Sequence, residues 1–166
     1  MPIKYSRKEI PRGSNYEGWT NRRITITGSE RPIDLVLESA TGDPSNYGCI
    51  DVFLSEAGEY IISDHYIWPE NDPNGSSRKT ICCFKDALSN FSSSGFRNAM
   101  LAGENEQEGE FFLQLTRNSN ASTVTVKVKI SEGEEGEPKY VVDSFNIPID
   151  DINDLIGALQ RYEEDG

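Results

Sequence analysis

The chain has 166 residues, of which 36% are hydrophobic and 27% are charged, and its formal net charge is −12. This length is sufficient for one domain that needs no disulfide or metal to hold it together. No segment approaches the roughly 20 apolar residues that cross a bilayer as a helix, and the first residues lack the apolar run of a signal peptide. We therefore expect a cytoplasmic protein.

The charge is distributed unevenly along the chain. Residues 1–32 contain seven Lys or Arg against three Glu, a net charge of +4, so the remaining residues carry −16. An acidic body repels nucleic acid and anionic membranes and attracts basic partners. The alternative is that the acidity serves solubility alone.

The N-terminal residues 1–22 combine charge, glycine and proline without periodicity, which predicts an irregular basic arm. From residue 23 onward, strand-like segments follow one another closely. Alternating apolar residues predict an antiparallel meander over 23–27, 33–38, 49–55 and 59–68. A loop over 69–77 precedes a fifth predicted strand over 78–83. This strand continues into a helix over 84–91, whose apolar residues are Phe84, Ala87, Leu88 and Phe91.

The second half has the same order of elements. Strands are predicted over 110–116, 122–130 and 140–149, and a helix follows Asp150, with Ile152, Leu155, Ile156, Leu159 and Tyr162 on one face. The sequence therefore predicts an α+β fold: an antiparallel sheet with two amphipathic helices on one side, in which a strands-then-helix unit occurs twice. The single domain spans 23–162, with halves 23–91 and 110–162, and 163–166 form an acidic tail.

The three cysteines are expected to be free thiols. Cys82 and Cys83 are adjacent in the apparent strand, where neighbouring side chains point to opposite faces, and Cys49 has no evident partner. A disulfide of Cys49 is the alternative.

Residues that could carry chemistry are sparse. His65 is the only histidine, and its neighbour Asp64 lies on the opposite face of the predicted strand, so Asp64 is poorly placed to orient the ring. His65 could still act as a catalytic base if a carboxylate distant in the sequence oriented its ring. Neither a metal-ligand spacing nor a phosphate-binding glycine loop is present. We expect no enzyme, no catalytic residue, no cofactor and no metal.

The expected function is therefore binding of a basic protein partner. Aromatic residues at a strand end beside acidic loops are typical of interfaces, although for Tyr66 and Trp68 a place in the core is an equal alternative. The predicted partner-binding residues are Tyr66, Trp68, Glu70, Asp72, Glu104, Glu106, Glu108, Glu132, Glu134 and Glu135.

The order of elements from residue 60 onward resembles small bacterial immunity proteins of the WapI-type polymorphic-toxin systems. The resemblance covers about 100 residues: the helix at 84–91, the strands at 110–115 and 124–130, and the final strand and helix over 145–159. It implies a non-catalytic inhibitor that caps a toxin domain.

The sheet-then-helix plan, used twice, also resembles the Whirly and PUR-type binders of single-stranded nucleic acid, which use a basic sheet face with stacking aromatics. The residues that would serve this alternative function are Arg23, Lys127 and Lys129. A structural or phage-encoded assembly protein is a third possibility. It predicts oligomers.

Overall fold

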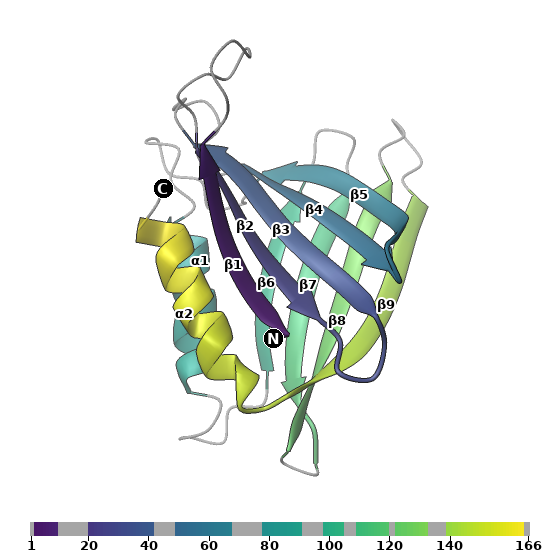
Figure 1. Ribbon diagram of the computed structural model, residues 1–166, viewed down its shortest axis with the longest axis vertical. Coiled ribbons are helices and arrows are strands. Elements are labelled where there is room, and N and C mark those ends of the chain that lie inside the picture. Colours follow the sequence, from purple (N-terminus) through teal and green to yellow (C-terminus); the bar gives the residue numbers. More distant parts are fainter. Residues whose placement is uncertain are drawn as a thin grey trace.

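The computed structural model describes residues 2–9, 20–41, 49–67, 78–90, 98–104, 109–119, 122–132 and 139–164. These ranges contain nine strands and two helices (Figure 1). The elements are β1 (Ile3–Glu9), β2 (Thr20–Thr27), β3 (Ile33–Thr41), β4 (Cys49–Glu56), β5 (Glu59–Ile67), α1 (Arg78–Ser89), β6 (Asn98–Glu104), β7 (Glu110–Arg117), β8 (Thr123–Glu132), β9 (Lys139–Pro148) and α2 (Asp151–Glu164). No helix among them is long and apolar enough to cross a membrane.

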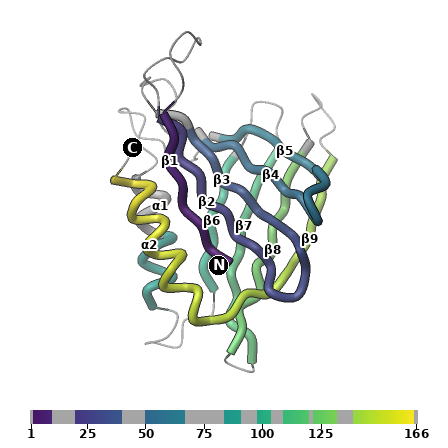
Figure 2. Tube along the Cα trace, viewed as in Figure 1, coloured from purple at the N-terminus to yellow at the C-terminus, as the bar shows by residue number. Residues whose placement is uncertain are grey.

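The nine strands form one antiparallel sheet in sequence order, from β1 to β9. Between β5 and β6 the only paired residues within the described ranges are Ile67 and Glu104, whereas the other neighbours pair along much of their length. The sheet folds over at this junction, so that β1–β5 lie in front of β6–β9 (Figures 1 and 2). The predicted α+β class is confirmed in this coarse sense, with the sheet dominant.

The core lies between the two layers because alternate residues of each strand are apolar. Ile24 and Ile26 of β2, Leu113 and Leu115 of β7, and Val126 of β8 are among its fully buried members. The buried side chains of both layers form one continuous cluster. Each layer therefore covers the apolar face of the other.

The two helices contact each other and lie along one margin of the molecule, between β1 in front and β6 behind (Figure 1). Helix α1 packs on β6, and α2 packs on β1 and β2. The inward face of α2 is formed by Ile152, Leu155, Ala158, Leu159 and Tyr162. The expected order of strands then helix, used twice, is correct. The expected position of both helices over one sheet face is wrong, because the second sheet layer occupies that face.

Three expectations about individual elements are wrong. Residues 3–9 of the supposed irregular arm form β1, which pairs with β2 along its whole length. Residues 78–83 belong to α1, so Cys82 and Cys83 lie in a helix and not in a strand. Residues 98–104 form β6, a strand that the sequence did not predict because it has no clear apolar alternation.

Arg22 joins the first layer to α2. Its guanidinium lies 4.1 Å from the centre of the Tyr162 ring and donates from Nη1 to the Tyr162 backbone carbonyl. The Tyr162 hydroxyl in turn shares a hydrogen bond with Ser39 of β3. A cation at the C-terminal end of a helix is favourable because the exposed carbonyls there carry partial negative charge.

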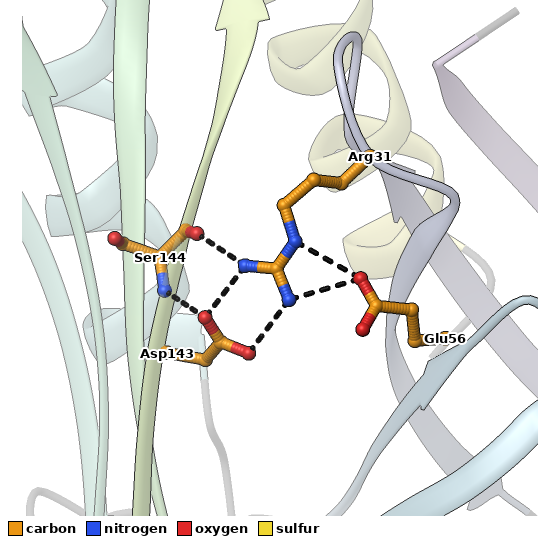
Figure 3. A network of polar contacts seen from close by, with 4 residues as sticks. All are labelled: Arg31, Glu56, Asp143 and Ser144. Carbon is orange, nitrogen blue, oxygen red and sulfur yellow. Dashed lines mark hydrogen bonds and ion pairs between the residues drawn. The ribbon is translucent and has the colours of Figure 1, made fainter.

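A second polar junction connects the β2–β3 turn to β9, as Figure 3 shows. The Arg31 guanidinium donates to both carboxylate oxygens of Asp143 at 2.7 and 3.1 Å, to Glu56 at 2.9 Å, and to the Ser144 carbonyl at 3.0 Å. These bonds lower the pKa of Asp143 and raise the pKa of Arg31, because each charged form stabilises the other. The junction holds the two layers together at the end opposite the β5–β6 crossing.

Candidate interaction surface

Tyr66 belongs to the core and not to a contact surface. Its side chain is fully buried and packs against Phe111, with ring centroids 5.3 Å apart. Its hydroxyl accepts a hydrogen bond from the Ser131 amide at 2.8 Å and lies 3.0 Å from the Ser131 hydroxyl. Burial raises the pKa of the Tyr66 hydroxyl, since ionisation there would lose hydration. The prediction that Tyr66 contacts a partner is therefore wrong.

Most of the predicted contact residues, Trp68 and six acidic residues, lie outside the described residues. These are Trp68, Glu70, Asp72, Glu106, Glu108, Glu134 and Glu135. Glu104 and Glu132 end β6 and β8, and the placement of their side chains is not described. The contribution of the acidic loops to binding stays a prediction from sequence.

The outer face of the β1–β5 layer carries charged groups that pair with one another. Arg23 donates to Glu38 at 2.8 Å across β2 and β3, so it does not join Lys127 and Lys129 in one basic stripe. His65 Nδ1 lies 2.7 Å from Asp51, its partner on β4. Asp51 is thus the distant carboxylate that the sequence left open.

The environment of the His65–Asp51 pair differs from that of a catalytic dyad. The side chains are 56% and 44% exposed, so water screens their interaction. A catalytic base is normally held in an environment that shifts its pKa toward the working pH, and burial is the usual means. The exposure of this pair is that of a surface hydrogen bond, which is an ion pair when the imidazole is protonated.

Large apolar side chains are exposed on both layers: Tyr60 and Ile61 lie on β5, and a larger set lies on the outer face of β6–β9. Met100 of β6, and Tyr140 and Val142 of β9, are 60%, 40% and 55% exposed. Phe112 of β7 is half-buried on the same face. We call this surface the aromatic–lysine face; its members are Met100, Phe112, Lys127, Lys129, Tyr140 and Val142.

The strand register makes the aromatic–lysine face continuous. Phe112 is opposite Lys129, and Lys129 is opposite Val142, so these three residues form one row across β7, β8 and β9. Met100 is opposite Gln114 in the adjacent row, which places it diagonal to Phe112. Met100 and Phe112 are therefore diagonal neighbours, and Lys129 of β8 separates Phe112 from Val142.

The two lysines of this face lie against its aromatic rings. Lys129 Nζ is 4.2 Å from the centre of the Tyr140 ring, and Lys127 Nζ is 6.0 Å from that of Phe112. Lys129 also lies 3.9 Å from the exposed carboxylate of Glu110. The lysine stems cover part of the apolar surface while the charged ends face solvent.

Lys127 and Lys129 are predicted from the sequence, whereas the apolar members of the face are not. A signal was present in the pairs Phe111–Phe112 and Val141–Val142, which put a large apolar residue on each side of a strand. One member of each pair must face away from the core. Met100 had no such signal because β6 itself was not predicted.

Among the described residues, no group of three or more His, Cys, Asp or Glu side chains is arranged to hold a metal ion. Comparisons with protein-family models, with curated proteins and with solved structures gave no match.

Proposed function

We propose that this protein is a non-catalytic binding module that engages a basic protein partner, in the manner of an immunity protein that caps a toxin domain. The observation that carries the proposal is the exposed aromatic–lysine face. Single exposed apolar residues are common, but contiguous exposed apolar residues with polar residues around them are typical of protein interaction sites. Met100, Phe112 and Val142 supply apolar contact area, and Tyr140 supplies an aromatic anchor.

The net charge selects the class of partner. A charge of −12 accelerates the approach of a basic protein and slows that of an acidic one at low salt. On the aromatic–lysine face itself, Lys129 lies between Phe112 and Val142, so the area for apolar contact lies on both sides of this lysine. The proposed partner is therefore basic overall, with an apolar surface that docks on this face.

A direct test uses the product of a toxin-sized gene directly upstream of this coding sequence, purified alone as the binding probe. Met100→Asp places a charge in the proposed contact area, on an outward-facing side chain that the fold does not need. We expect the dissociation constant, measured by calorimetry, to rise at least tenfold. Tyr60→Asp is the matched control, because Tyr60 is 68% exposed on the other layer.

The proposal also predicts how salt affects the association of the two proteins. Association should slow as salt increases, because the attraction is between opposite net charges. The absence of such a gene, failure of its product to bind, or equal losses from Met100→Asp and Tyr60→Asp would each contradict the proposal.

A single-stranded nucleic acid is the second candidate partner. The observation in its favour is the placement of Lys127 beside Phe112 and of Lys129 beside Tyr140, since cations and stacking rings are the two elements that such binders combine. Against it stands the net charge. Arg23 does not contribute, because it is paired with Glu38 on the other layer.

Fluorescence anisotropy of a labelled oligothymidylate separates the two candidates. A nucleic-acid binder should lose affinity steeply between about 50 and 200 mM salt, and Lys127→Glu should weaken it further. Lys8→Glu, the same charge change on β1, is the control. Salt-sensitive binding of this kind would favour the nucleic acid over the protein partner.

A further inference from the structure

Strand β9 is an edge of the sheet, and half of that edge is open among the described residues. It pairs with β8 on one side and is the last strand in the sheet order. In Figures 1 and 2 it forms the right-hand margin of the rear layer. The β2–β3 turn covers its second half, where Ser29 donates to the Asn146 carbonyl and Arg31 to the Ser144 carbonyl.

Those two contacts show how the β9 backbone is oriented. The carbonyls of residues 144 and 146 point away from β8, and in a strand the backbone groups of alternate residues point to the same side. The amide and carbonyl groups of Tyr140 and Val142 therefore also point outward. The described residues show no backbone partner for them. An open edge of this kind is a template for another strand.

The residues of this edge are complementary to themselves. An antiparallel pair of two β9 strands with its two-fold axis at Val141 puts Lys139 opposite Asp143 of the second copy. It also puts Tyr140 opposite Val142 in both directions, which is a favourable aromatic–β-branched pair. Tyr140 and Val142 would exchange the outward-pointing hydrogen bonds. This register uses none of the backbone groups that the β2–β3 turn covers, although the carboxylate of Asp143 is already bound by Arg31 of that turn.

We propose that two copies of this chain pair through residues 139–143 of β9, giving a symmetric dimer with one continuous sheet across the two-fold axis. The opposite charges of Lys139 and Asp143 select this register, because a shift by two residues puts Lys139 opposite an apolar residue. In this register Asp143 would face two cations, Arg31 of its own chain and Lys139 of the second copy. The aromatic–lysine faces of the two copies then join into one surface.

Self-association is measured on the protein alone, so the test is independent of any partner. In sedimentation equilibrium over a dilution series at about 0.15 M salt, where repulsion between acidic copies is screened, we expect a monomer–dimer equilibrium. Lys139→Glu puts like charges opposite each other twice and should raise the dissociation constant at least tenfold. Lys8→Glu, the same charge change on the opposite edge strand β1, should leave it unaltered.

Val142→Pro is a second variant that spares the fold. Proline is tolerated on an edge strand where the missing amide faces outward, so thermal unfolding of the monomer should stay cooperative while the dimer is lost. A monomer at all concentrations of the wild type would overturn the proposal. So would a dimer that tolerates both Lys139→Glu and Val142→Pro.

Cross-linking tests the register itself. Two Val141 residues would face each other as a non-hydrogen-bonded pair, with Cα atoms about 4.5 Å apart, which is within the range of a disulfide. Val141→Cys should therefore form an intermolecular disulfide on mild oxidation, identified by peptide mass spectrometry. Lys139→Cys is the control, since the two positions 139 would be about 13 Å apart. Equal cross-linking of both variants would contradict this register.

Discussion

Arg22 and Arg23 are neighbours in the sequence whose side chains lie on opposite faces of β2. Arg22 is buried against Tyr162, whereas Arg23 is about half exposed and paired with Glu38. Removing Arg22 leaves a space in the core and a helix-end carbonyl without its donor, while removing Arg23 breaks a solvated ion pair. The same substitution at these two positions therefore has very different consequences.

We expect Arg22→Ala to lower the free energy of unfolding by about 2–3 kcal/mol. Arg23→Ala, its matched control, should lower it by less than about 1 kcal/mol. Urea denaturation followed by circular dichroism measures both. Equal costs for the two variants would show that the contact of Arg22 with α2 contributes little.

Ala57 has a positive φ angle, a backbone conformation that residues other than Gly and Asn seldom adopt. It precedes Gly58 in the β4–β5 turn, and their φ angles are 52° and 80°. Two positive φ angles in a two-residue hairpin turn favour Asn-Gly. Ala57→Asn should raise the free energy of unfolding by about 0.5–1 kcal/mol, and Gly58→Ala should lower it by a similar amount. Thermal denaturation checks both signs; stabilisation by Gly58→Ala would contradict the argument.

At the scale of the element, the β2–β3 turn is held to β9 by Arg31. Arg31→Gln should destabilise the protein only modestly at neutral pH, since the ion pairs that it breaks are partly exposed. The pKa of Asp143 is lowered in the folded protein, so its ion pair contributes fully above the unfolded pKa of about 3.9. That contribution disappears as the pH falls through the lower folded pKa.

The destabilisation caused by Arg31→Gln should therefore shrink in acid. Urea denaturation of wild type and variant at a series of pH values from neutral to about 2 measures the difference. A difference that stays constant down to the lowest pH would show that Asp143 is not the partner that matters. Lys4→Gln, which removes a cation exposed on β1, serves as the control.

The elements that the sequence predicts well are those with uninterrupted alternation. Strand β8 is an example: Val124, Val126, Val128 and Ile130 are all buried, as their spacing indicates. Strand β6 has only Leu101 as a large buried residue, beside Ala99 and Gly103, so its apolar pattern is too weak to detect. Small residues fit there because α1 packs on this strand.

Two other errors arise because tertiary contacts override local preference. β1 contributes only Ile3 to the buried core, and its exposed charged residues give no apolar alternation from which a strand could be predicted. Residues 80–83 of α1 read Thr-Ile-Cys-Cys, a strand-like composition that the helix nevertheless includes. The aromatic–lysine face was only partly predictable, since exposure depends on which layer covers which face.

At the scale of the whole molecule, the two sheet layers are joined more by side-chain contacts than by strand pairing. In the part of the chain that the structure describes, strand pairing between them is limited to Ile67 and Glu104. The Tyr66–Ser131 hydrogen bonds, the Arg31 junction and the helices supply other links. The buried side chains nevertheless form a single cluster. A shared core should make the layers unfold together, because neither can keep its apolar face covered alone.

Tyr66→Phe tests this cooperativity at the junction between β5 and β8. The variant keeps the ring but leaves the buried Ser131 amide without its acceptor, at a cost of about 1–2 kcal/mol. If the layers unfold as one unit, hydrogen-exchange protection of the slowest amides should fall by the same factor in β2–β3 and in β7–β8. Tyr60→Phe, on an exposed residue, should leave protection unaltered in both layers. Loss of protection confined to β5 and β8 would mean that the junction opens locally, and that the single core does not make the two layers one folding unit.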